Sequence, residues 1–168
     1  MNQMMWDPAQ GQYQTLKVRT EGSICFVQFY RPDANNTIND VMLAELNTVL
    51  SILAQNNHPS QPKSADDICI VVFEGLPEVF CYGADFNALA GGYSEGNAEQ
   101  QDPEFIYNVW QQMATGPFVT VAHVRGKVNA GGVGFVAACD IVLSDTTATF
   151  DHFNIGTRLP PTFRDTLP

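Results

Sequence analysis

The stretch PFVTVAHVRGKVNAGGVGFVAACDIVLS, residues 117–144, sets the fold class because its hydrophobic pattern changes twice. Its first eight residues predict a buried strand, since apolar and β-branched residues follow one another with little polar interruption. A glycine-rich turn comes next, then an apolar segment from Val133 that predicts a helix, and then a short strand at IVLS. This order of strand, loop, helix and strand is typical of an α/β fold with parallel strands.

The first third of the chain predicts a hairpin followed by a helix. Residues 15–19 and 24–30 alternate or are apolar on either side of the turn TEGS, which indicates two antiparallel strands. Apolar residues then recur at helical spacing over residues 41–55. Asn39 or Asp40 can cap the free amides at the start of this helix.

The remaining segments separate into regular elements and loops. ICIVVFEG, residues 68–75, predicts a fully buried strand without a polar face, and residues 105–113 predict another helix. The polar stretches 56–67 and 91–101 predict surface loops. From Phe150 onward the chain loses all period and contains three prolines, which is not typical of the end of a core.

Charge and composition exclude several classes of partner. Eighteen acidic and eight basic side chains give a net charge of −10, so nucleic acid and anionic membranes are poor partners. The sequence has no leader-like N-terminus and no apolar run long enough to span a membrane, and we expect a soluble cytoplasmic protein. We interpret the four widely spaced cysteines as buried free thiols and not as a metal site or a disulfide framework.

Two glycine-containing turns are suited to act through main-chain groups. In FCYGADF, residues 80–86, and again in NAGG, residues 129–132, a strand ends, glycine permits a tight turn, and a helix begins. Two N–H groups aimed from two loops at one oxygen form an oxyanion hole. Each turn is also compatible with glycine required for steric reasons alone. Neither turn has the Walker pattern or the G-x-G-x-x-G spacing of a dinucleotide site.

These turns and their surroundings resemble the crotonase, or enoyl-CoA hydratase/isomerase, superfamily. The matching stretches are residues 27–50, 70–89 and 119–150. The resemblance implies an α/β fold, a crotonase-like ββα spiral that is C-terminally truncated here. It divides the chain into an N-terminal extension (1–12), a crotonase-like core (13–150) and an aberrant tail (151–168) without the family's C-terminal helices.

The resemblance also implies roles for individual residues. The main-chain N–H groups of Ala84 and Gly131 are expected to form the oxyanion hole for a thioester carbonyl. Asp33, Ala34 and Asn35 fall where family members wrap the coenzyme A or phosphopantetheine arm that carries the substrate. No other cofactor and no metal is expected.

Further polar residues lie beside the two turns. Tyr82 and Asp85 can contact substrate, although Asp85 also suits the first turn of a helix. The amide of Asn129 can bind a substrate hydroxyl or carboxylate, or it can hold its own loop by local hydrogen bonds. Arg31, Arg125 and Lys127 suit the phosphate of a pantetheine arm, an acidic carrier protein or a solvated surface.

Gly134 is the main departure from the family pattern. Hydratases of the family place a catalytic Glu at this position, three residues after the oxyanion-hole glycine. The sequence is most similar to the polyketide β-branching branch, which lacks this Glu and keeps a later one. His152 or Asn154 stands at the later position, depending on the direction of counting, and neither is a carboxylate. His152 is compatible with a general base or with an exposed side chain.

The resemblance therefore implies a lyase that dehydrates 3-hydroxy-3-methylglutaryl-ACP to 3-methylglutaconyl-ACP in polyketide β-branching, with weak or no turnover by this chain. One alternative is a general enoyl-CoA hydratase or isomerase, which Gly134 disfavours. Another is a non-catalytic chain that binds a carrier protein or associates with full-length subunits. The expected partner is an acyl carrier protein or an acyl-CoA thioester; the family's trimer would lack its C-terminal contacts.

Overall fold

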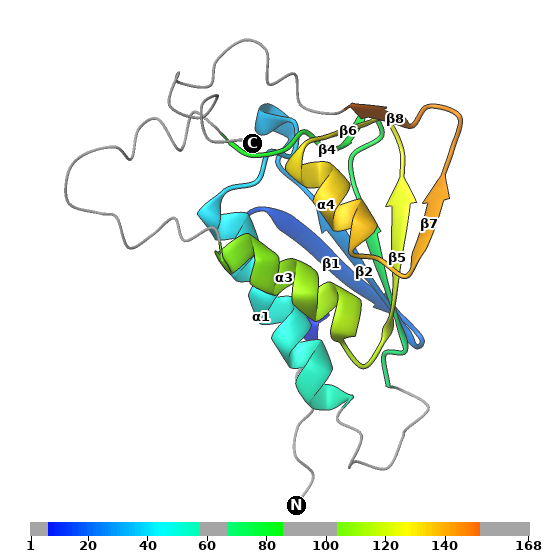
Figure 1. Ribbon diagram of the computed structural model, residues 1–168. Coiled ribbons are helices and arrows are strands. Elements are labelled where there is room, and N and C mark those ends of the chain that lie inside the picture. The colour runs from blue at the N-terminus through cyan, green and yellow to red at the C-terminus, as the bar shows by residue number, and fades with distance from the viewer. Residues whose placement is uncertain (1–6, 58–66, 86–103, 152–168) are drawn as a thin grey trace, which may run out of the picture.

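The computed structural model describes residues 7–57, 67–85 and 104–151 as an α/β structure with two sheets (Figure 1). The elements are η1 (Pro8–Gln10), β1 (Leu16–Glu21), β2 (Ile24–Phe29), η2 (Pro32–Ala34), α1 (Asp40–Asn56), β3 (Ile70–Glu74), β4 (Val79–Cys81), α3 (Glu104–Thr115), β5 (Val119–Val124), β6 (Lys127–Asn129), α4 (Gly131–Ala137), β7 (Ile141–Ser144) and β8 (Thr149–Asp151). The larger sheet has the order β1-β2-β3-β5-β7, and the smaller sheet has the order β4-β6-β8. Figure 1 shows α1 and α3 side by side in front of the larger sheet.

The strand pairing confirms both parts of the predicted topology. β1 and β2 form an antiparallel hairpin whose register runs from Leu16 opposite Phe29 to Glu21 opposite Ile24. β2, β3, β5 and β7 then pair in parallel, as the repeated strand, loop and helix order predicted. All strands of the smaller sheet also run parallel. Parallel strands place their carboxyl ends, and the turns that follow, at one edge of each sheet.

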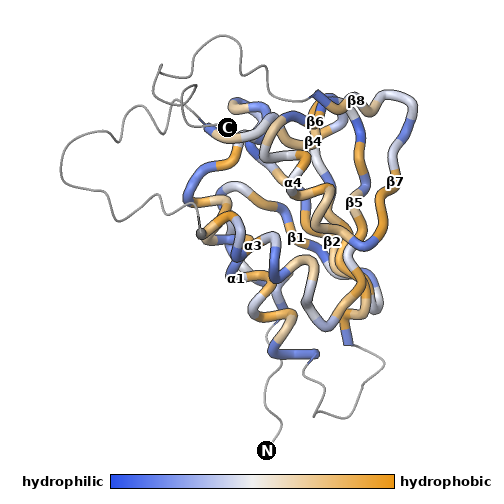
Figure 2. The backbone as a smooth tube through the Cα atoms, in the orientation of Figure 1, coloured by the Kyte–Doolittle hydropathy of each residue, from blue (hydrophilic) through white to orange (hydrophobic). Residues whose placement is uncertain are grey.

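The strand β3 has one buried and one partly open face, which corrects the prediction of a fully buried strand. Val71 and Phe73 are buried, whereas Ile70, Val72 and Glu74 are only partly buried. The reason is that successive side chains of a strand point to opposite faces, and the described helices cover one of them. Figure 2 shows hydrophobic residues concentrated along these central strands.

The helix α1 confirms the predicted cap and apolar face. The Asn39 side chain accepts a hydrogen bond from the Met42 N–H at 3.0 Å, which satisfies one of the free amides of the first turn. The buried face of the helix consists of Met42, Leu43, Leu46, Val49, Leu50 and Leu53. The predicted helix at residues 105–113 is confirmed as α3. It contacts α1 through a hydrogen bond of 2.6 Å from Gln112 Nε2 to Asn47 Oδ1.

The end of the described chain differs from the sequence prediction. Regular structure was expected to end at Phe150, but Thr149–Asp151 form β8, which pairs with β6 and extends the smaller sheet. The expectation failed because a three-residue strand has no readable period. The rest of the predicted tail lies outside the described residues. So do residues 1–6, 58–66 and 86–103, and with them the predicted loop at 91–101.

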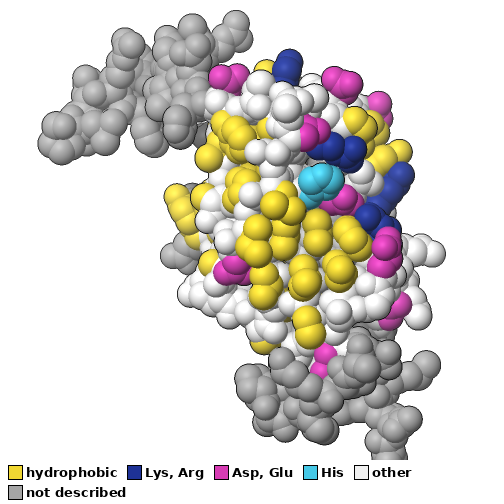
Figure 3. All heavy atoms as spheres, turned by 90° about the vertical axis from the view of Figure 1, so that its right-hand side faces the viewer, with side chains coloured by type: hydrophobic (Ala, Val, Ile, Leu, Met, Phe, Trp, Pro, Cys, Tyr) yellow, Lys and Arg dark blue, Asp and Glu magenta, His cyan; other side chains and the backbone are white. Residues whose placement is uncertain are grey.

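Side chains of β7 give one side of the molecule an apolar surface. Ile141, Val142 and Leu143 are 46%, 46% and 56% exposed. Figure 3 shows hydrophobic side chains gathered on this side, next to a histidine. Within the described ranges, no helix is long and apolar enough to cross a membrane.

The cysteines confirm the prediction of free thiols, with one correction on burial. Cys25 and Cys81 are buried, and burial raises the pKa of each thiol to about 12. Cys139 is partly buried. Cys69 is exposed, contrary to the expectation, because it lies just before β3 begins.

A charged cluster covers part of the open face of the larger sheet. Arg19 Nη1 lies 2.8 Å from Glu74 Oε2, and His123 Nδ1 lies 3.2 Å from Glu74 Oε1. Burial raises the pKa of the Glu74 carboxyl, but the hydrogen bonds from Arg19 and His123 outweigh it, and the pKa falls below its ordinary value of 4.5.

The lowered pKa of Glu74 predicts acid-sensitive stability. Because the carboxyl is more acidic in the folded chain, its contribution is present above about pH 4.5 and is lost as the pH falls through the folded pKa. The melting temperature should therefore fall more between about pH 7 and about pH 3 in the parent chain than in Glu74→Gln. Thermal unfolding monitored by circular dichroism measures this. Equal pH dependence in the two proteins would contradict the assignment.

Candidate functional site

The two glycine-containing turns singled out in the sequence lie against each other. A Cβ added at Gly83 would lie 3.0 Å from Ala130 Cβ, 3.2 Å from Asn129 O and 3.5 Å from Gly131 N. Gly83 also has φ +90°, a backbone conformation that side chains rarely allow. Glycine at position 83 thus permits both the turn and the close approach of the second loop.

The smaller sheet explains why these turns meet. β4 and β6 are parallel neighbours, with Val79 opposite Lys127 and Cys81 opposite Val128. Each strand ends just before its turn, so both turns leave the same edge of the sheet. A Cβ at Gly132 would lie 3.0 Å from Cys81 Cβ, and the start of α4 therefore packs directly on β4.

The predicted donors Ala84 and Gly131 belong to these adjoining turns. Ala84 pairs with Ile38: the Ile38 N–H donates to Gly83 O at 2.7 Å, and the Asp85 N–H donates to Ile38 O at 2.9 Å. Neither the Ala84 N–H nor the Gly131 N–H has an acceptor among the residues that the structure describes. That both groups are open to an external acceptor stays a prediction. That they converge on one oxygen stays a prediction.

Asp85 joins the first turn to the segment that follows β2. Its Oδ2 lies 2.8 Å from Arg31 Nη2, and both side chains are largely buried, at 13% and 18% exposed. Arg31 Nη1 also donates to Thr37 O and, at 3.2 Å, to Thr37 Oγ1. Arg31 is therefore not a solvated surface side chain, whereas its contact with a phosphate stays a prediction. The helix expected to begin at Asp85 falls outside the described residues.

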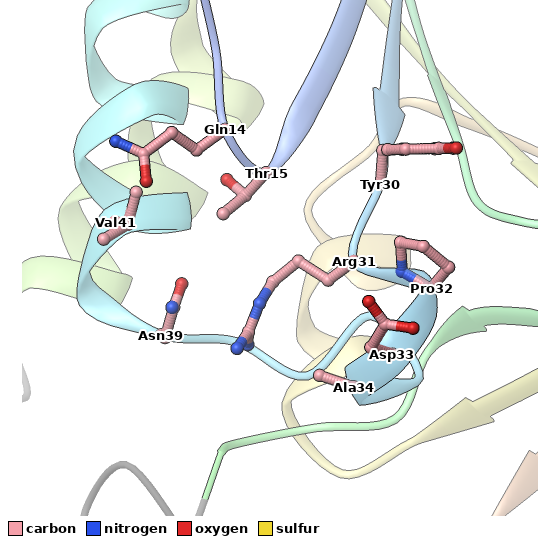
Figure 4. Close-up of a pocket in the computed structure, with 9 residues that line it drawn as sticks. All are labelled: Gln14, Thr15, Tyr30, Arg31, Pro32, Asp33, Ala34, Asn39 and Val41. Carbon is pink, nitrogen blue, oxygen red and sulfur yellow. The ribbon is translucent and has the colours of Figure 1, made fainter.

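The segment predicted to wrap the substrate arm borders two separate hollows. Asp33 and Ala34 lie in η2 and line a hollow of about 460 Å³ between η2, the start of β1 and the start of α1 (Figure 4). Asn35 has φ 50° and lines a second hollow of about 240 Å³, which Tyr82 and Lys127 also line. Tyr82 is 44% exposed, and its aromatic ring is accessible to a ligand. Asn35 and Tyr82 thus line one hollow, whereas Asp33 and Ala34 line the other.

Asn36 positions this segment, a role that was not identified from the sequence. It is fully buried; its Oδ1 accepts from the Arg31 N–H at 2.7 Å, and its Nδ2 donates to Val79 O and Phe80 O at 3.3 and 3.1 Å. These bonds tie the segment to β4. The paired asparagines in DANN are the only sequence signal, because Asn adopts left-handed turns.

Asn129 carries an unpartnered polar atom beside the second turn. Its Oδ1 is buried without a hydrogen-bond donor among the described residues. Within the described ranges this oxygen therefore does not hold its own loop, and the choice between the two roles considered from the sequence stays a prediction. The following residue, Ala130, has φ 45° and ψ −113°, a strained conformation for a residue with a side chain.

Gly134 lies beneath an aromatic ring. A Cβ at this position would lie 2.6 Å from Trp110 Cε2, so the indole fills the space that a side chain would occupy. Position 134 thus has no carboxylate, and the Trp110 ring occupies the space in which a side chain there would lie. His152 and Asn154 lie outside the described residues. Over the described ranges, no group of three or more His, Cys, Asp or Glu side chains could hold a metal ion.

Comparison with known proteins identifies the class to which this fold and these turns belong. The sequence profile of the enoyl-CoA hydratase/isomerase family matches residues 19–166, and the chain belongs to this family. Its fold is the α/β crotonase fold.

Individual relatives place the chain more finely within the family. It is 46% identical over 138 residues to bacillaene synthase dehydratase PksH from Bacillus subtilis, covering 82% of this chain and 49% of the relative. A probable enoyl-CoA hydratase from Rhizobium meliloti is 26% identical, with 82% and 49% covered. A crystal structure of a putative polyketide biosynthesis enoyl-CoA hydratase (pksH) from Bacillus subtilis superposes with a TM-score of 0.73 at 46% identity, covering 84% of this chain and 52% of that chain. The chain spans about half the length of these relatives.

Proposed function

We propose that this protein is a cytoplasmic hydro-lyase that removes water from 3-hydroxy-3-methylglutaryl-ACP to give 3-methylglutaconyl-ACP during polyketide β-branching. The observation that carries the proposal is the contact between the turns at Gly83 and Gly131, which contain two main-chain N–H groups without acceptors among the described residues. The 46% identity to a protein named as a polyketide dehydratase supports this choice of reaction.

The proposed chemistry proceeds through an enolate. Removal of the proton on the carbon next to the thioester places negative charge on the carbonyl oxygen, and the N–H groups of Ala84 and Gly131 stabilise that charge. The electrons of the enolate then form the carbon–carbon double bond as the β-hydroxyl leaves. The leaving hydroxyl takes up a proton and becomes water. Asn129 Oδ1, a buried acceptor without a donor in the part of the chain that the structure describes, can hold the substrate hydroxyl. The group that moves the protons is not assigned.

The substrate arm is proposed to lie along the segment at Asp33–Asn35. This segment borders both hollows, and the second of them brings together Asn35, Tyr82 and Lys127. The exposed Lys127 ammonium can contact the phosphate of a phosphopantetheine arm or an acidic carrier protein. No further cofactor is required by this chemistry, since the arm arrives with the substrate.

A second candidate is a chain that binds a carrier protein or a full-length subunit without turnover. The exposed apolar side chains of β7 favour it. A general enoyl-CoA hydratase is less well supported, because Gly134 offers no carboxylate and packs against Trp110.

A mass measurement distinguishes the two candidates. The purified chain, in excess over 3-hydroxy-3-methylglutaryl carrier protein, should convert it to a product lighter by one water. The same carrier loaded with 3-hydroxybutyryl serves as the matched substrate, and a hydratase of general specificity would act on both. Capture of the carrier without any mass change would support the non-catalytic candidate and contradict the proposed lyase.

A further inference from the structure

The indole of Trp110 has an unsatisfied donor beside the proposed acyl site. Its Nε1 is buried and has no hydrogen-bond acceptor among the described residues. The ring packs edge-on against Tyr107 at 5.4 Å and against Phe135 at 6.1 Å between ring centroids. A ring without an N–H would serve packing equally well, because burying a donor without an acceptor costs folding free energy. A buried Trp N–H usually has a partner.

The position of this donor relates it to the second turn. Ile106 and Trp110 are one turn apart on α3 and lie over Gly131 and Gly134, which are one turn apart on α4. A Cβ at Gly131 would lie 3.9 Å from Ile106 Cδ1, and one at Gly134 would lie 2.6 Å from Trp110 Cε2, the atom bonded to Nε1. Three residues of an α-helix advance about 4.5 Å along its axis, slightly less than one turn. The indole thus packs on α4 at Gly134, close to the start of the helix where Gly131 carries the proposed donor.

We infer that Trp110 is a specificity-determining residue whose Nε1–H donates a hydrogen bond to an oxygen of the acyl group beyond the thioester. The inference rests on the proposed function. The ligand chemistry is an acceptor oxygen on the acyl chain, because the described neighbours of the indole are aromatic rings and glycine. In 3-hydroxy-3-methylglutaryl thioesters, the 3-hydroxyl and the distal carboxylate both have this chemistry.

Four pantetheine thioesters distinguish which of these two oxygens accepts the hydrogen bond. The 3-hydroxy-3-methylglutaryl ligand has both, 3-hydroxy-3-methylbutyryl has only the hydroxyl, 3-methylglutaryl has only the carboxylate, and 3-methylbutyryl has neither. The full chain, labelled with ¹⁵N at the indoles, is titrated with each. It contains two tryptophans, Trp6 and Trp110, so Trp110→Phe assigns the two indole signals and Trp6→Phe is the matched control.

The Trp110 indole N–H signal should shift with the ligands that contain the bonded oxygen and not with 3-methylbutyryl. Trp110→Phe should weaken binding of those ligands about fivefold, the effect of one neutral hydrogen bond, and leave 3-methylbutyryl binding unchanged. The ligand pattern identifies the hydroxyl or the carboxylate as the acceptor. If Trp110→Phe does not fold, the shift of the indole N–H signal in the parent chain decides whether Trp110 donates to the acyl group.

Two results overturn the inference in distinguishable ways. Binding of all four thioesters without an indole shift, or equal weakening of all four by Trp110→Phe, refutes the role of Trp110 and leaves the proposed function standing. Failure of every thioester to bind refutes the proposed function together with the inference.

Discussion

Replacing Gly131 with proline should slow water elimination about 10²- to 10³-fold, the usual cost of losing one oxyanion donor. Proline removes the N–H of this residue and keeps a backbone angle suited to the first position of a helix, which Gly131 occupies in α4. The rate is measured in single turnover with the chain in excess over acyl carrier protein, so that slow chemistry is resolved. The melting temperature is measured alongside it.

Gly131→Ala is the matched control for the proline variant. Both replacements introduce a Cβ, which would lie 2.9 Å from the flexible Cδ1 end of Ile38, but only proline deletes the N–H. The alanine variant should keep most of the parent rate. If alanine and proline slow the reaction equally, crowding against Ile38 is the cause, and the proposed donor role of Gly131 is wrong.

Introducing glutamate at position 134 should unfold the site and should not create a hydratase. The Trp110 ring occupies the space next to Gly134, so the new side chain must displace a packed indole. We expect the free energy of unfolding to fall by about 3 kcal/mol, the upper range for overpacking. Urea-induced unfolding followed by circular dichroism measures this change.

Two variants control for the added charge and for the ring. Ala137→Glu places the same side chain at an exposed position of α4 and should change stability by no more than about 0.5 kcal/mol. Combining Gly134→Glu with Trp110→Ala should recover part of the loss, because the two residues are in contact. Equal stability of the two glutamate variants would show that Trp110 does not fill this space.

The regular elements were predictable from the sequence because their signals are local. The apolar period over residues 41–55 and the cap at Asn39 together specify α1, and both belong to one short segment. The hairpin of β1 and β2 was equally readable from its turn. Which face of β3 is covered was not readable, since this depends on helices that are distant in the chain.

The meeting of the two turns was also predictable, but the side-chain contacts around them were not. The turns at Gly83 and Gly131 follow parallel strands, and parallel neighbours place their turns together. Arg31 and Asp85 are 54 positions apart, and no sequence period links them. The contact of Trp110 with Gly134 depends on how α3 packs on α4. Such pairs follow from tertiary packing, which propensity does not contain.

The unusual backbone of Ala130 bears on how fast the second loop can respond to a substrate. Its positive φ is imposed by the surrounding fold, between β6 and α4. A residue held in such a restricted backbone conformation limits the rotation of the neighbouring peptide unit. For the proposed oxyanion role, this means that the Gly131 dipole would need little reorientation when charge builds on a bound acyl group, and the solvent-like reorganisation that slows reactions in water would largely be avoided.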